Sequence, residues 1–490
     1  MPTKELVIAS KALAVPDYPP LPGQSGAGKD GLLIRAVSRA GEARRVMSRV
    51  MHDMRYRPPR RRTAKLLVLI PAHNEEATIG KNLNALLTQT RVPDRIVVIA
   101  DNCTDRTEQI ARRYRGVTVM RTVGNTERKV GALNQAFLRW QAGYDYIAGV
   151  DADTVLAPDC LQRLEEELAA TPRAGGVMAR YTFDQQLGTS AMARMLIRMQ
   201  RLEFASWTAD ALHRKRKTYV LGGQCTLFNA DALRAVADRN RTQEPWDTST
   251  MVEDMQLTGD LQAMRYATKV STSARAYAGP MVTVRSLWHQ RRKWDEGMIR
   301  LLVGSMVNRW TATLWRQQLS LFANGITRAV FLFLLSASLI VHQYVWSWWW
   351  AVPPAVAALL NLKLAWRVPN RTTADLVSAV LLVPVEIYLI VRVACATASW
   401  VNVLAGIKRD GWANQARAEQ GGSNGPAKML FAVLVVAVLA AAAVLGWTHA
   451  PLFVQQRTLI VGWGALAVVT VLQVLIMVIR IFRPNRGLRP

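Results

Sequence analysis

Apolar and polar positions follow two alternating periods along residues 66–300, and this alternation predicts a sheet of parallel strands covered by helices. Short apolar runs of the buried-strand type stand at 66–70, 96–100, 117–121 and 146–150. Stretches with helical spacing lie between them, at 77–90, 105–115 and 129–142. Strands that alternate with helices predict a doubly wound, Rossmann-like sheet, whose ligands bind beyond the carboxyl ends of the strands.

A different pattern begins after Trp315, where long apolar stretches replace the alternation. Four of these stretches have the length of a membrane span, and we expect them to cross: 322–341, 345–364, 429–447 and 459–481. A fifth stretch at 376–403 contains Glu386 and Arg392, which are costly in lipid. A crossing there would also place later basic residues outside, against the positive-inside rule. We therefore expect residues 376–403 to form an interfacial or re-entrant helix, with five true spans as the alternative.

The first 65 residues fit neither pattern. Residues 1–30 are rich in proline and glycine and are predicted to be disordered. Residues 31–65 combine helical spacing with many arginines, which is typical either of a solvated helix and linker or of an amphipathic element on an anionic membrane surface. No signal-peptide pattern stands near Met1, so we expect the chain to start in the cytoplasm.

Composition narrows the possible partners and compartments. A chain of 490 residues is expected to form at least two structural units, here one soluble and one in lipid. The net charge of +27 indicates cytoplasmic loops and contact with anionic lipid in a chain with membrane spans. No nucleic-acid motif accompanies this charge, so a nucleic-acid partner is not expected. The four cysteines lack the spacing of a zinc site or a disulfide framework.

Acidic residues stand directly after two of the predicted strands. Asp101 follows the strand at 96–100, and Asp151 and Asp153 form an Asp-x-Asp motif after the strand at 146–150. Such a carboxylate pair can hold a divalent cation that bridges the two phosphates of a nucleotide diphosphate. An isolated Asp-x-Asp is more often a solvated turn, but its position after a strand and downstream of Asp101 favours the catalytic interpretation.

Four further segments carry candidate chemistry. They are Pro71-Ala72-His73-Asn74-Glu75, Arg128-Lys129-Val130-Gly131-Ala132-Leu133-Asn134, Val252-Glu253-Asp254, and Gln290-Arg291-Arg292-Lys293-Trp294. Each also has a purely structural interpretation: a turn, a surface lysine, acids that cap a helix, and a basic helix beside the membrane. Gly222-Gly223 lies between Asp153 and Asp254, where glycine permits close backbone approach but a tight turn explains it equally well.

With these motifs, the chain resembles the membrane-integrated glycosyltransferase family 2 enzymes, a group that includes cellulose, hyaluronan, chitin and poly-N-acetylglucosamine synthases. The motifs cover residues 66 to about 300, and the architecture covers 315–482. The resemblance implies a cytosolic α/β domain of the GT-A type over 66–300 and an α-helical transmembrane domain over 301–490. It also implies a multi-pass protein of the inner or plasma membrane, with the catalytic domain in the cytoplasm.

The resemblance also assigns roles to residues. Asp153 is the principal ligand of Mg²⁺ or Mn²⁺, with Asp151 beside it. Asp254 is the base that removes the acceptor proton, and Glu253 orients a neighbour. Acceptor-binding residues are Trp294, Gln290 and Gly223. Nucleotide-binding residues are Ala72, Glu75, Asp101, Lys129, Asp151, Arg291 and Lys293.

Lys293 departs from the pattern of the family, where arginine is usual at this position. Lysine offers a compact charge in place of a planar, bidentate fork, so Arg291 or Arg292 could share its contact with the diphosphate.

The leading functional hypothesis is therefore an inverting, metal-dependent, processive β-glycosyltransferase. It would use a UDP-sugar, best UDP-N-acetylglucosamine, to extend and secrete a polysaccharide, with a glycan acceptor and membrane lipid as its other partners. The alternative is a non-processive enzyme that adds a single sugar to a lipid or polyprenyl-phosphate acceptor. A third class is a transporter or scaffold whose sheet domain only binds nucleotide. Partner subunits are not predicted.

Overall fold

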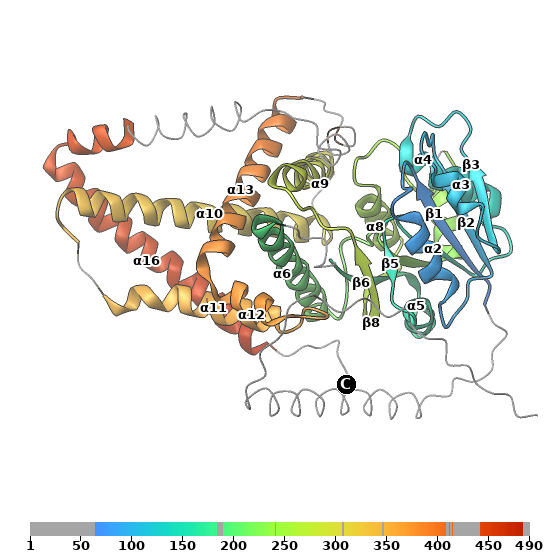
Figure 1. Cartoon of the computed structure of the whole chain (residues 1–490). Coiled ribbons are helices and arrows are strands. Elements are labelled where there is room, and N and C mark those ends of the chain that lie inside the picture. The colour runs from blue at the N-terminus through green and yellow to red at the C-terminus, as the bar shows by residue number, and fades with distance from the viewer. Residues whose placement is uncertain are drawn as a thin grey trace, which may run out of the picture. The chain divides into compact units, whose positions relative to one another are not determined.

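The strand-helix alternation of the sequence is present in the computed structural model of the chain (Figure 1). The structure describes residues 64–183, 190–240, 242–305, 308–344, 347–407, 411, 414 and 442–483. The predicted disordered segment at 1–30, nearly all of the amphipathic segment at 31–65 and most of the span predicted at 429–447 lie outside these residues.

The described strands form one sheet in the order β3-β2-β1-β4-β7-β6-β8-β5. Strands β1 to β4 are parallel, as predicted for a Rossmann-like sheet. The other half is mixed, because β7 pairs antiparallel with both β4 and β6, and β5 pairs antiparallel with β8. The bounds are β1 Leu66–Ala72, β2 Arg95–Ala100, β3 Val117–Arg121, β4 Tyr146–Gly149, β5 Val155–Leu156, β6 Ala174–Phe183, β7 Thr226–Asn229 and β8 Ala267–Ala278.

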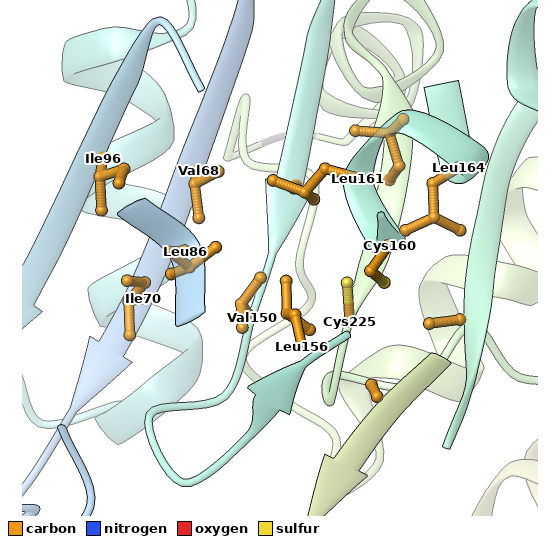
Figure 2. Packing of buried hydrophobic residues seen from close by; sticks show 14 of the residues in the cluster. Val68, Ile70, Leu86, Ile96, Val150, Leu156, Cys160, Leu161, Leu164 and Cys225 are labelled. Atoms are coloured by element: carbon orange, nitrogen blue, oxygen red, sulfur yellow. The ribbon is translucent and has the colours of Figure 1, made fainter. Parts of the chain in front are cut away.

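Helices cover both faces of this sheet, so its central strands are apolar on both sides. On β1, Val68 and Ile70 face one core with Leu86 and Leu161, whereas Leu67 belongs to the other core. Figure 2 shows part of the first core between the strands and the helices. The helices of this domain are α2 Ile79–Leu87, α3 Thr107–Ala111, α4 Arg128–Trp140, α5 Cys160–Ala169, α6 Ala191–His213, α7 Ala230–Arg239, α8 Glu253–Ala263 and α9 Val284–Gly304.

Three helices in the described part of the chain are long and apolar enough to cross a membrane: α10 Thr311–Ile340, α13 Leu382–Leu404 and α16 Leu452–Phe482. The span predicted at 459–481 lies within α16, and the one predicted at 322–341 lies within α10 except for its last residue. In Figure 1 these two helices run beside each other.

The segment predicted to span at 345–364 has a different form. Its described residues form the short helices η2 (Trp348–Ala351) and α11 (Val352–Ala365). The 14 residues of α11 extend over about 21 Å, less than the hydrocarbon core of about 30 Å. This segment therefore does not form one membrane-length helix.

The segment predicted to be interfacial, 376–403, divides at Leu381 into α12 (Thr373–Val380) and α13. Its two costly charges have partners. Glu386 accepts two hydrogen bonds from Arg328 of α10, one of them at 2.9 Å, and Arg392 pairs with Asp295 of α9 at 3.1 Å. Paired charges that face other helices are tolerated in apolar surroundings, so the length of α13 favours the alternative in which this segment crosses.

Candidate active site

A cavity of about 2070 Å³ begins at the carboxyl ends of the parallel strands and continues between the apolar helices. Most of the residues that the sequence assigned to the site line this one cavity. They are Ala72, Glu75, Asp101, Lys129, Asp151, Asp153, Glu253, Asp254, Gln290, Lys293 and Trp294. Gly223 and Arg291 are not among the lining residues, although Gly223 lies directly behind them.

The carboxylate of Asp101 is held in a fixed orientation at the end of β2. Its Oδ1 accepts hydrogen bonds from Asn125 Nδ2 at 2.7 Å, Thr122 Oγ1 at 2.8 Å and Asn102 Nδ2 at 3.2 Å. Only 5 % of the residue is exposed. Neighbouring Ala72 closes β1, and its carbonyl oxygen accepts from the backbone N–H of Asp101 at 2.9 Å. The two strand ends are thereby joined into one floor of the cavity.

Asp151 and Asp153 offer carboxylate oxygens of the kind that divalent cations bind. Burial, and next the negative charge of Asp151, raise the pKa of Asp153 to about 6. Two carboxylates that repel each other at one cavity wall favour an incoming cation that would keep both of them ionised. The described residues contain no group of three or more acidic, histidine or cysteine side chains arranged so that they could hold a metal ion together. A cation here would therefore complete its oxygen shell with phosphate and water, as Mg²⁺ commonly does.

Lys129, at the start of α4, lies among three carboxylates. Its Nζ is 2.6 Å from Asp151 Oδ1 and 3.7 Å from Glu253 Oε1. Burial lowers the pKa of Lys129, but the charges of Asp151, Asp254 and Glu253 outweigh burial and raise it. The ammonium is therefore charged at any physiological pH, and it neutralises only part of the surrounding negative charge.

Asp254 occupies the first turn of α8 and faces the same cluster. Its Oδ2 accepts a hydrogen bond from the backbone N–H of Gly223 at 2.8 Å, and the carbonyl oxygen of Gly223 accepts from the backbone N–H of Asp151 at 3.0 Å. Burial raises the pKa of Asp254 to about 7; Lys129 opposes this rise, and Glu253 and Asp151 add to it. A carboxyl group with a pKa near neutral is suited to accept a proton during catalysis.

A side chain at position 223 would have to displace Lys129 in this arrangement. A Cβ there would lie 2.3 Å from Lys129 Nζ and 3.1 Å from Asp151 Oδ1. Glycine therefore allows the backbone to bridge Asp151 and Asp254 while Lys129 passes beside it.

Trp294 belongs to an aromatic cluster with Phe204 and Trp207 of α6. The ring centroids of Phe204 and Trp207 are 4.5 Å apart, and those of Trp207 and Trp294 are 6.3 Å apart. All three residues line the cavity. Our sequence analysis did not assign Trp207 to the site; its position three residues after Phe204, on one face of a helix, was the signal available.

Arg291 lies away from the position that the sequence assigned to it. It is fully buried and donates to Glu203 Oε2 at 2.7 Å and to the hydroxyl of Tyr388 at 3.3 Å. Its guanidinium lies 4.5 Å from the centroid of Trp294. Of the three consecutive basic residues of this segment, Lys293 is the one that lines the cavity.

Curated synthases are similar to this chain over about half of its length. Among curated proteins, the chain is similar to the poly-beta-1,6-N-acetyl-D-glucosamine synthase of Staphylococcus epidermidis, with 25% identity over 52% of this chain and 58% of that protein. It is also similar to the beta-monoglucosyldiacylglycerol synthase of Synechocystis sp., with 26% identity over 53% of each. The chain spans little more than half the length of these relatives.

Among solved structures, the chain is similar to the mannosyltransferase PcManGT from Pyrobaculum calidifontis in complex with GDP-Man and Mn²⁺. The TM-score is 0.47 at 16% sequence identity, over 76% of this chain and 98% of that one. The model of the family described as "Glycosyl transferase family 2" matches residues 67–237, the part of the sheet domain that contains Asp101, Lys129, Asp151 and Asp153. Residues 67–237 are thus similar to family 2 glycosyltransferases, and the sheet domain has an α/β fold of the GT-A type.

Proposed function

We propose that the protein is an inverting, metal-dependent, processive β-glycosyltransferase that moves sugar from a UDP donor onto a growing glycan. The observation that carries this proposal is the shared cavity, in which the acidic cluster at the strand ends and the aromatic cluster of α6 and α9 face the same space. The donor that we propose is UDP-N-acetylglucosamine, and the similarity to poly-beta-1,6-N-acetyl-D-glucosamine synthases supports this choice.

The donor would bind across the carboxyl ends of β1, β2 and β4. Ala72 and Glu75 would line the nucleoside pocket, and Asp101 would accept a hydrogen bond from the uracil ring N–H. Asp151 and Asp153 would hold Mg²⁺ or Mn²⁺, which supplies positive charge to the departing diphosphate. Lys129 is placed to exchange its pairing with Asp151 for a phosphate oxygen, and Lys293 would bring a second charge from α9.

The acceptor sugar would lie against Trp294, because the face of an indole suits the C–H face of a pyranose. Gln290, on the same side of the cavity, would donate to an acceptor hydroxyl. Asp254 would then take the proton of the attacking hydroxyl, while that oxygen bonds to the anomeric carbon opposite the leaving diphosphate. Glu253 would hold Lys129 beside the base.

We further propose a multi-pass protein of the inner or plasma membrane, with the sheet domain on the cytoplasmic side, where UDP-sugars are made. The three membrane-length helices in the described part of the chain support this location. The continuation of the cavity between those helices offers the glycan a route away from the site.

A second candidate is non-processive transfer of one sugar to a lipid acceptor. The similarity to a beta-monoglucosyldiacylglycerol synthase supports it, as does Lys293 at a position where processive relatives carry arginine.

Product analysis separates these candidates. Membranes that contain the protein are incubated with radiolabelled UDP-N-acetylglucosamine or UDP-glucose and with Mg²⁺ or Mn²⁺. Processive transfer gives a high-mass product that a glycosidase degrades, whereas the second candidate gives label that extracts into organic solvent. Chelation should stop the reaction, and added Mn²⁺ should restore it. No transfer from any UDP-sugar would refute both candidates and leave a protein that only binds nucleotide.

A further inference from the structure

The cavity is lined by acidic side chains at the strand ends and by basic side chains at the ends of several helices. The basic side chains are His213 at the end of α6 in the sheet domain, Lys363 in the last turn of α11, and Arg480 and Arg483 at the end of α16. All four line the same cavity as the acidic cluster, and Arg367, just after α11, lines it as well. We call Lys363, Arg480 and Arg483 the basic cap.

These cations are close enough to repel one another. Burial, and next the charges of Arg483, Arg367 and Lys363, lower the pKa of His213. Lys363 is fixed at the end of α16, because its Nζ donates to the carbonyl oxygens of Arg480, at 3.0 Å, and Ile481. The basic cap is therefore a preformed group of charges drawn from two helices.

Carboxylates at this end of the cavity are already paired. Asp210, near His213, forms ion pairs with Arg214 at 3.0 Å and with Arg316 at 3.4 Å. Glu386 forms its ion pair with Arg328. Because both acids have other partners, the basic cap keeps an excess of positive charge that suits an anion.

The wall beside the basic cap is mostly apolar. Helices α11 and α16 contribute Ala357, Leu360, Leu364, Ile476, Met477 and Ile479 to the lining, together with the polar Asn361 and Gln473. None of the described lining residues from these two helices is aromatic, so this wall lacks the flat faces on which sugar rings stack. An apolar wall that ends in fixed cations is complementary to a hydrocarbon chain with an anionic head.

We propose that this end of the cavity binds a membrane lipid that carries a phosphate. The hydrocarbon would lie against α11 and α16, and the phosphate would meet the basic cap, where lysine and arginine are the usual partners of phosphate oxygens. The proposal concerns binding alone, so it stands or fails independently of which sugar or acceptor the acidic cluster serves.

The test measures lipid binding by the purified full-length protein in a neutral detergent. Tritiated polyprenyl phosphate and phosphatidic acid are titrated against their uncharged counterparts, polyprenol and diacylglycerol, and against inorganic phosphate alone. We expect at least one phosphate-bearing lipid to bind about tenfold or more tightly than its uncharged counterpart. The double variant Arg480→Gln/Arg483→Gln should remove most of this preference. Lys363→Met, which keeps an apolar stem, should weaken it by a smaller factor.

The matched control is Arg113→Gln/Arg115→Gln, which removes the same charge from an exposed surface of the sheet domain and should leave binding unchanged. Equal binding of charged and uncharged lipids would overturn the proposal, as would an equal loss in the control or inorganic phosphate that binds as tightly as the lipids. An unchanged unfolding temperature shows that the double variant is folded; if it is not, Lys363→Met decides by the same comparison.

Discussion

Two buried clusters of charge in this protein contain the same kinds of side chain in different proportions. The catalytic cluster places Lys129 among three carboxylates, those of Asp151, Glu253 and Asp254. The junction cluster joins α6, α9 and α13. Its members are Arg291, Arg392, Glu203, Asp295 and the hydroxyl of Tyr388.

The junction cluster is balanced. Glu203 pairs with Arg291 at 2.7 Å and with Arg392 at 3.1 Å, and Asp295 pairs with Arg392 at 3.1 Å. Two guanidinium groups thus meet two carboxylates, and Tyr388 donates to Glu203 at 2.6 Å. The charges of this network compensate one another without a further ion. The network holds α9, the helix that carries Trp294, against α13.

The catalytic cluster keeps an excess of negative charge, and its neighbouring carboxylates add to the effect of burial on the pKa values of Asp254 and Asp153. Burial raises the pKa of Asp254 to about 7 and that of Asp153 to about 6. An incoming cation would relieve the repulsion, and a proton from a substrate would do the same. The difference in charge balance therefore distinguishes the catalytic cluster, which can take up a cation or a proton, from the junction cluster, which holds helices in place.

The largest expected effect comes from removing the proposed base. Asp254→Asn keeps the size of the side chain but cannot accept a proton, so we expect the transfer rate to fall about a thousandfold. Binding of UDP, measured by calorimetry with Mn²⁺ present, should persist because Asp151 and Asp153 are unchanged. Full transfer activity in this variant would show that another group is the base.

The junction cluster should respond in stability. Arg291→Met removes one partner of a buried ion pair and should lower the free energy of unfolding by about 3 kcal/mol. This value is near the lower limit for the loss of a buried ion pair, because Glu203 still pairs with Arg392 in the variant. The measurement is the unfolding temperature in detergent, followed by tryptophan fluorescence. Arg112→Met is the matched control: it removes an exposed pair with Glu108, worth no more than about 0.5 kcal/mol. An equal response of both variants would contradict the structural role of Arg291.

A smaller effect is expected where the catalytic cluster has no spare room. In Gly223→Ala the new methyl group would push Lys129 away from Asp151, and a displacement of about 1 Å at the chemistry costs roughly a hundredfold in rate. Gly149→Ala, on the neighbouring strand β4, is the control, because its Cβ would meet Phe228 at an ordinary 3.9 Å. Comparable rates for the two variants would mean that the bridge through Gly223 is dispensable.

Sequence patterns predicted which acidic residues meet at one cavity but did not predict the junction cluster. Asp101, Asp151 and Asp153 stand at the ends of buried apolar runs, and parallel strands bring such ends to one edge of a sheet, so the local pattern was sufficient. The partners of Arg291 and Arg392 are distant in the chain, with Arg291 and Tyr388 separated by 97 residues. No periodicity reports such a pairing.

Ion-pair partners that are distant in the chain also affect the prediction for 376–403. Glu386 and Arg392 argued against a crossing because unpaired charges are costly in lipid. Their partners, Arg328 and Asp295, become apparent only when helices α10 and α9 are in place. The segment at 345–364 is the opposite case. Its apolar composition predicted a span, but its described residues form two adjoining short helices, η2 and α11.

The smallest expected effect is the pH dependence of the catalytic cluster, and it distinguishes the two raised carboxyl groups. Because Asp254 acts as a base only when ionised, a pKa of about 7 means that kcat/KM should fall by up to about tenfold for each pH unit below 7 and level off above it. Asp153, with a pKa of about 6, would add a second limb that moves to lower pH as the Mn²⁺ concentration rises, since the cation competes with the proton. The limb of Asp254 should move less with Mn²⁺, because burial is the main cause of its raised pKa and Asp151 contributes less. A rate that is constant between pH 5.5 and 8 at fixed Mn²⁺ would contradict the assignment of the excess negative charge to catalysis, and the two clusters would then differ in composition without differing in function.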